Sequence, residues 1–136
     1  MPIDVASLQA TFERLAADYV KRLGLVIDSV QADGVTLRMP VLPELVHGGG
    51  VLCGQAILAA ADTAMLLAMI AMLGEFKPMT TVQLQTSFVR PVPKDAAEVT
   101  VIGRVLRRGK SLSYGEVEFT TEGKLAAHAT TTYALL

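Results

Sequence analysis

Cysteine and histidine are scarce in this sequence. The single cysteine, Cys53, excludes an internal disulfide and fits a reducing compartment, so we expect a cytoplasmic protein. Two histidines and one cysteine are too few for a structural zinc site with four such ligands, and we expect no metal. Residues 1–10 have neither a basic start nor a long apolar run, so no secretory signal peptide is expected.

Aromatic residues and net charge are also low. Only 5% of the residues are aromatic while 51% are hydrophobic, which predicts an aliphatic core. The net charge of −1 gives no general electrostatic case for binding nucleic acid or an anionic membrane. A chain of 136 residues is long enough for one domain with a real core, so we expect residues 1–136 to form a single domain.

The most unusual stretch is residues 51–73, in which only Gln55, Asp62 and Thr63 carry strong polar groups. A helix this apolar on every side is buried either in a membrane or in a protein. Asp62 near the midpoint, the preceding glycines and the lack of Lys or Arg just before the stretch argue against a membrane. We therefore expect a central core helix at about 51–73 and no membrane span.

The flanking sequence predicts one more helix and six strands. Apolar residues at three- and four-residue spacings indicate an amphipathic helix over 5–23. Strands are expected over 25–30, 35–39, 80–89, 98–106, 111–120 and 125–135. Hairpin-length connections imply an antiparallel sheet that curls round the central helix, an α+β fold. The exposed edges and outer face of a single sheet favour a homo-oligomer.

Two features of the central stretch carry possible chemistry. A carboxylate in the middle of an apolar helix is costly unless it is paired or used, and Asp62 suits a general base or nucleophile. The alternative is a satisfied structural residue. Gln55, Asp62 and Thr63 are expected on one helix face, two turns apart. The glycines before the helix favour free N–H groups that hold a phosphate or polarise a carbonyl, or else a tight loop without a ligand.

This order of elements, with glycines before an Asp-Thr helix, resembles the PaaI-like (phenylacetate-degradation-related) branch of the hotdog-fold thioesterases. The resemblance covers essentially the whole chain and implies a hotdog fold, in which a curved antiparallel sheet wraps a long central helix. It also implies an acyl-CoA thioesterase that needs no cofactor beyond the coenzyme A of its substrate. The implied assembly is a homo-oligomer, at least a dimer, with a tetramer favoured.

The family motif Asn-x-x-Gly-x-x-His-Gly-Gly, with an Asp nine residues after the His, can be aligned in two registers. Aligning its His-Gly-Gly with His47-Gly48-Gly49 puts the acid on Ala56, which has no acidic group. Aligning the acid with Asp62 puts Cys53 in place of the His, and we adopt this register. The remaining motif positions then fall on His47, Gly50, Gly54 and Gln55, with departures from the motif at His47, Cys53 and Gln55.

By this resemblance, Asp62 is the base or nucleophile and the amides at Gly54 and Gln55 polarise the thioester. Thr81 is expected to orient the water across a dimer interface, and His47 and Gln55 are stand-ins for the groups that place the substrate. Gly50 and Cys53 are further expected substrate contacts. The basic residues expected to meet the phosphates of coenzyme A are Arg90, Arg107, Arg108 and Lys110.

The sequence leaves open two other functions and one other catalytic mechanism. The departures from the motif also fit a module that binds acyl-CoA without cleaving it. A hydratase or dehydratase on the same fold usually pairs a His with an acidic residue, and here His47 is the only nearby candidate. A nucleophilic Cys53 with His47 as its base is the other mechanism, since a helix start lowers the pKa of a thiol.

Overall fold

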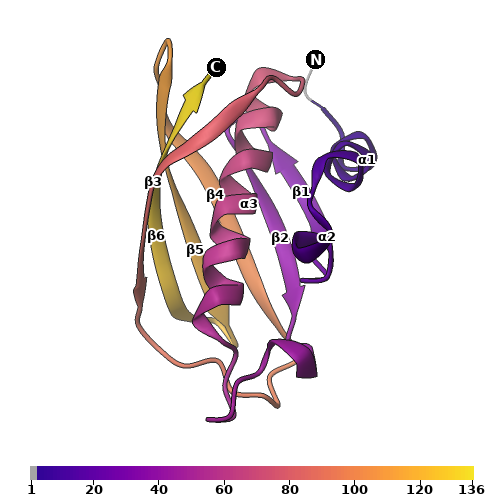
Figure 1. Cartoon of the computed structure of the whole chain (residues 1–136), viewed down its shortest axis with the longest axis vertical. Helices are drawn as coiled ribbons and strands as arrows, with labels where there is room; N and C mark the ends of the chain where they lie inside the picture. The colour runs from indigo at the N-terminus through magenta and orange to yellow at the C-terminus, as the bar shows by residue number, and fades with distance from the viewer. Residues whose placement is uncertain (1–2) are drawn as a thin grey trace.

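One long helix, α3 (Gly54–Leu73), lies in the curve of a six-stranded antiparallel sheet (Figure 1). The computed structural model describes residues 3–136. The strands are β1 (Val26–Gln31), β2 (Gly34–Pro40), β3 (Met79–Phe88), β4 (Glu98–Arg108), β5 (Leu112–Thr121) and β6 (Lys124–Leu135). Their order across the sheet is β1-β2-β4-β5-β6-β3. The α+β architecture predicted from the sequence is confirmed, and every strand end lies within two residues of its expected position.

Burial explains why α3 has almost no polar face. Its side chains pack on the concave side of the sheet, and Met65, Leu67 and Ile70 are fully buried. Although α3 is long and apolar enough to cross a membrane, 67% of its most apolar window is buried inside the protein. Burying each large aliphatic side chain contributes about 1.5–3 kcal/mol, so this helix supplies much of the stability of the fold.

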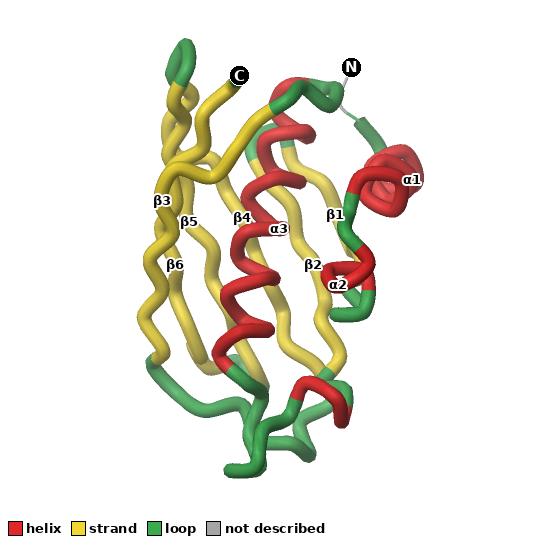
Figure 2. The backbone as a smooth tube through the Cα atoms, viewed as in Figure 1, coloured by secondary structure: helices red, strands yellow, loops and turns green. Residues whose placement is uncertain are grey.

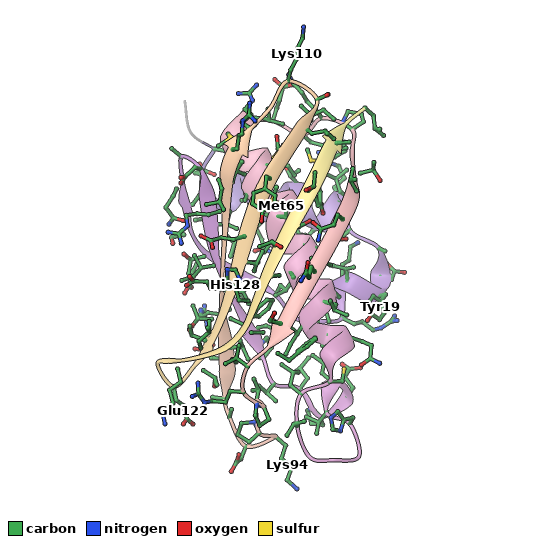
Figure 3. The ribbon with its side chains drawn as sticks, turned by 90° about the vertical axis from the view of Figure 1, so that its left-hand side faces the viewer. Tyr19, Met65, Lys94, Lys110, Glu122 and His128 are labelled. Carbon is green, nitrogen blue, oxygen red and sulfur yellow. The ribbon has the colours of Figure 1, made fainter. Side chains whose placement is uncertain are left out.

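Glycine in β5 lets α3 approach the sheet closely. A Cβ atom on Gly115 would lie 2.5 Å from the Met65 sulfur and 2.6 Å from the Arg104 carbonyl oxygen. The sulfur can move, but the carbonyl belongs to the backbone of the neighbouring strand β4. In Figure 3, Met65 lies behind the middle of the sheet, where this packing occurs.

The expectation of one helix over 5–23 is wrong, because the structure has two. α1 (Val5–Leu15) ends where Ala16 and Ala17 take extended backbone angles, and the short helix α2 (Asp18–Lys21) follows. The periodicity that predicted a single helix included Tyr19, which is 53% exposed. After the break, Leu23 is buried in the same hydrophobic core as Leu8 and Phe12 of α1. Tertiary packing therefore outweighs the continuous apolar spacing.

The central helix begins at Gly54 rather than at position 51. Val51 and Leu52 form isolated β-bridges with Pro93 and Val46, and the Leu52 N–H donates to the Val92 carbonyl over 2.8 Å. These bridges hold Val51 and Leu52 in extended conformations and use their backbone hydrogen-bonding groups. The helix therefore starts only after Cys53. The loop before it contains the short 3-10 helix η1 (Pro43–Leu45) and a left-handed Gly50.

The two edges of the sheet differ in cover (Figure 2). α1 packs against β1, and the Gln9 side chain accepts a hydrogen bond from the Ile27 N–H over 3.2 Å. β3 forms the opposite edge and pairs only with β6. Most residues of β3 are exposed, and its register shifts between Thr81 and Gln83. Such a bulge re-aims the side chains of the strand that carries it.

We expect Gly115→Ala to lower the free energy of unfolding by about 1–3 kcal/mol, because the added methyl group meets backbone that cannot move aside. Gly48→Ala is the control, since a Cβ atom on Gly48 meets nothing within 4 Å. Urea unfolding of both variants measures the difference. Equal unfolding midpoints would show that the sheet and α3 relax apart without cost.

Candidate active site

The Asp62 carboxylate lies partly exposed between α3 and the β3 side of the sheet, held by two hydroxyl groups. The Thr81 hydroxyl donates to its Oδ1 over 2.6 Å, and the Tyr133 hydroxyl approaches the same oxygen over 2.6 Å. Tyr133 also lies 2.7 Å from the backbone carbonyl oxygen of Asp62. Among residues 3–136, no group donates to Oδ2. One oxygen of the carboxylate is therefore fixed by the fold, and the other is available.

Thr81 and Tyr133 meet at Asp62 because β3 and β6 are neighbours. The two residues are partners in the antiparallel register of these strands. Within the chain, the Thr81 hydroxyl bonds Asp62, and the expectation that Thr81 orients water across a dimer interface stays a prediction. The sequence could not reveal this pairing, since the two residues are far apart in the chain.

Tyr133 was missed by the sequence reasoning and is the most buried member of the group. Its side chain is 4% exposed. Burial raises the pKa of its hydroxyl far above the ordinary value, and the bond to the Asp62 carboxylate raises it further. The phenol therefore keeps its proton at any physiological pH and acts as a hydrogen-bond donor to the carboxylate.

The start of α3 offers free backbone donors. Cys53 is the N-cap residue but makes no side-chain capping bond, and its own N–H donates to the Leu45 carbonyl. The described residues supply no acceptor for the amides of Gly54 and Gln55. Free amides at the positive end of a helix dipole favour a partly negative oxygen. The helix starts directly after Cys53, which the adopted register aligns with the motif histidine, and His47-Gly48-Gly49 lie in the preceding loop.

A cavity of about 370 Å³ opens beside this helix start. Its walls come from the loop before α3, from Gly54 and Ile57 of α3, and from the end of β3 with the residues that follow it. Phe88 lies close to the helix start, since a Cβ atom on Gly54 would be 3.4 Å from its ring. The lining is mostly apolar, with His47 and Arg90 as its two basic side chains.

His47 and Cys53 are not paired in the structure. The His47 Nδ1 accepts the Gly49 N–H over 2.8 Å, so the neutral ring carries its proton on Nε2. No hydrogen bond joins the imidazole to the Cys53 thiol in the part of the chain that is described. Gly50 closes the same loop, and its carbonyl accepts the Lys94 N–H over 3.0 Å.

The basic residues proposed from the sequence do not form one cluster within the chain. Arg90 lies at the cavity, and its guanidinium donates to the Leu125 carbonyl over 2.7 Å. Arg107 and Arg108 end β4, and Lys110 lies in the turn that follows, at the opposite end of the molecule from Lys94 (Figure 3). The four basic candidates therefore lie at two ends of the sheet.

The polar stripe on α3 is also shorter than expected. Gln55 is exposed and Asp62 is partly exposed on one face, two turns apart. Thr63 is buried instead, and its hydroxyl donates to the Ala59 carbonyl of the same helix over 2.8 Å. One residue is 100° of helical rotation, which is enough to turn Thr63 away from the carboxylate.

Comparisons with known proteins identify the family. Residues 49–127, more than half of the chain, match the family model described as the thioesterase superfamily. A conserved protein from Pseudomonas aeruginosa is 29% identical, with a TM-score of 0.83 and coverage of 91% of this chain and 98% of that one. No curated protein matches the sequence.

Two further solved structures share the fold at lower identity. A thioesterase from Haemophilus influenzae is 23% identical, with a TM-score of 0.87 over 100% of this chain and 92% of that one. The PaaI protein from the phenylacetic acid degradation operon of E. coli is 21% identical, with a TM-score of 0.81 and coverage of 94% of this chain and 89% of that one. The resemblance stated from the sequence is thus confirmed, and this chain belongs to the thioesterase superfamily with the hotdog fold.

Proposed function

We propose that the protein hydrolyses an acyl-CoA thioester, with Asp62 as the general base or nucleophile. The observation that carries the proposal is the unequal use of the Asp62 carboxylate, whose Oδ1 is held by two hydroxyls while Oδ2 is open. Because Oδ2 is not among the buried polar atoms that lack a partner, it is open to solvent and can bond a water molecule. Membership of the thioesterase superfamily supports the reaction class.

The proposed thioester hydrolysis needs only a carbonyl-polarising group and a base or nucleophile. Free amides at Gly54 and Gln55 polarise the thioester carbonyl and stabilise the negative charge that develops on its oxygen. Oδ2 of Asp62 takes a proton from water as the water oxygen bonds to the carbonyl carbon, or attacks that carbon itself. The carbon–sulfur bond then breaks, and the thiolate leaves and takes up a proton. On the direct-attack route, water then hydrolyses the anhydride between the acyl group and Asp62, which releases the acid and restores the carboxylate. A thiolate is a good leaving group, so no strong general acid is required.

The cavity at the helix start is the proposed place for the substrate. Its apolar walls suit an acyl chain or the pantetheine arm, and Arg90 brings a positive charge to its rim. We propose Arg90 as the first contact for the phosphates of coenzyme A, because it is the basic residue of the proposed set that lines this cavity. Arg107, Arg108 and Lys110 stay candidates at the other end of the sheet.

We further propose that the working unit is a dimer in which two chains share each site. Gly54 and Asp62 are eight residues apart on α3, or about 12 Å along a helix that rises about 1.5 Å per residue. For direct attack, one carbonyl group must lie about 3–3.5 Å from both the amide and the carboxylate. One chain cannot place both groups this close to one carbonyl. In a dimer, the amide of one chain and the carboxylate of the other can both reach it.

The exposed edge strand supports a dimer. β3 has one unpaired edge, and its Val82 and Phe88 side chains are 57% and 54% exposed. An exposed edge with apolar residues is a ready surface for pairing with a second copy. The outer face of the sheet also carries half-exposed Leu106, Leu112 and Tyr114, which supports further association into a tetramer. We also propose a cytoplasmic location, because a single cysteine fits a reducing compartment.

We expect Asp62→Asn to lower the rate of thiol release from acyl-CoA substrates by about 10²–10⁴-fold, because the amide can neither accept the proton nor attack. A thiol-release assay over short, medium and aromatic acyl groups measures this. Cys53→Ala is the control and is expected to keep most of the activity, whereas a cysteine nucleophile predicts an inactive variant. Wild-type hydrolysis that survives Asp62→Asn would falsify the proposed mechanism.

The same assay separates the alternative functions. Binding of acyl-CoA by the wild type, measured by calorimetry, with no turnover for any acyl group would favour a binding module. Water addition to an enoyl-CoA without thiol release would favour a hydratase. Neither result is expected here, because Asp62 has an open oxygen and no histidine among the described residues bonds it.

Mixed dimers test whether two chains share each site. Gly54→Pro removes one amide donor at the first helical position, which tolerates proline, and Cys53 already has the extended angles that a following proline needs. We expect each of Asp62→Asn and Gly54→Pro to be nearly inactive alone. A doubly tagged heterodimer of the two should regain about half of the wild-type rate, since one of its two symmetric sites is intact. No recovery in the purified heterodimer would place both groups of each site on one chain.

A further inference from the structure

The position of Asp62 depends on a residue of the last strand rather than on its own helix. α3 supplies the carboxylate, but neither donor to Oδ1 belongs to α3. Thr81 comes from β3 and Tyr133 from β6. The direction in which the free oxygen points is therefore decided by the sheet.

The two donors differ in how firmly they are held. Thr81 is exposed, and it lies at the register shift of the edge strand β3. Tyr133 is buried, and its strand β6 is paired on both sides, with β5 and with β3. A donor whose side chain is fixed by packing on all sides holds its acceptor better than one on an exposed edge strand. Tyr133 is thus the firmer of the two anchors.

The Tyr133 hydroxyl touches Asp62 at two atoms. It lies 2.6 Å from Oδ1 and 2.7 Å from the backbone oxygen of the same residue. Because a phenol has a single proton and both atoms are acceptors, that proton is shared between them. This arrangement fixes both the helix backbone at Asp62 and the rotation of its carboxylate. Oδ2 is left without a partner among the described residues.

We propose that Tyr133 is a positioning residue for the reaction, which fixes Oδ1 of Asp62 and leaves Oδ2 as the single reacting oxygen. The inference rests on the proposed hydrolase function of Asp62. It adds that the acting oxygen is selected by a phenol on β6, and that Thr81 alone cannot select it. Tyr133 touches neither water nor thioester, and it acts only through the carboxylate.

Tyr133→Phe removes the hydroxyl and keeps the ring that fills the core. We expect kcat to fall about 10–100-fold while KM changes less than about twofold, because the substrate still binds but the carboxylate is misaligned. Tyr114→Phe is the matched control, since it deletes the same atom from a tyrosine on the outer face of β5 and should leave kcat unchanged. Thermal unfolding of both variants reports any loss of stability separately.

A double-mutant cycle shows whether Tyr133 acts through Asp62. Adding Tyr133→Phe to Asp62→Asn should cost no further activity, because the group that it positions is already lost. An additional loss of the same size in the double variant would assign Tyr133 to general stability and overturn the proposal. Full activity of Tyr133→Phe beside an inactive Asp62→Asn would also overturn it, while leaving the hydrolase function in place.

A crystal structure of Tyr133→Phe provides a test that does not depend on activity. We expect the Asp62 carboxylate to rotate from its wild-type position and to keep only the Thr81 bond. An unchanged carboxylate orientation would overturn the proposal. If Asp62→Asn retains wild-type activity, the proposed function fails, but the structure still decides whether Tyr133 orients this side chain. Should Tyr133→Phe not fold, Thr81→Val tests the converse, with the carboxylate expected to stay in place on Tyr133 alone.

Discussion

The burial of α3 in the curve of the sheet is the interaction on which the rest of the structure depends. An aliphatic helix with fully buried Met65, Leu67 and Ile70 can be stable in water only if the strands cover it. That requirement bends the sheet and leaves β3 as a poorly covered edge. It also brings the partly exposed face of α3, with Asp62, close to β3 and β6.

The cost of placing a carboxylate on such a helix explains the local chemistry. A charged group on a mostly apolar helix is stabilised by hydrogen-bond donors, and the sheet supplies Thr81 and Tyr133. Both act on one oxygen, so the stabilisation of the charge and the availability of the second oxygen arise from the same contacts. The two hydrogen bonds stabilise the charge of Asp62, and in the proposed reaction they also leave Oδ2 free to act as the base.

Much of the fold could be predicted from the sequence because its patterns are local. The apolar run, the turn residues and the alternating strands each depend on neighbours within a few residues, and they placed all six strands. The single helix expected over 5–23 was wrong because the chain breaks after Leu15. We relate this break to the burial of Leu23, which depends on tertiary packing rather than on local sequence. The start of α3 was placed three residues early because Val51 and Leu52 bridge to distant segments instead of joining the helix.

The sequence by itself determined the wrapped-helix architecture and the presence of one carboxylate, Asp62, at the middle of the apolar helix. Both follow from residue order, since hydrophobic spacing and chain connectivity are written in one dimension. Only the tertiary structure decided which groups hold that carboxylate. Tyr133 lies 71 positions from Asp62 in the sequence. The pairing of β3 with β6 places Thr81 and Tyr133 side by side at this carboxylate. Strand order in a sheet is set by packing over the whole domain, and no local pattern in β6 encodes it.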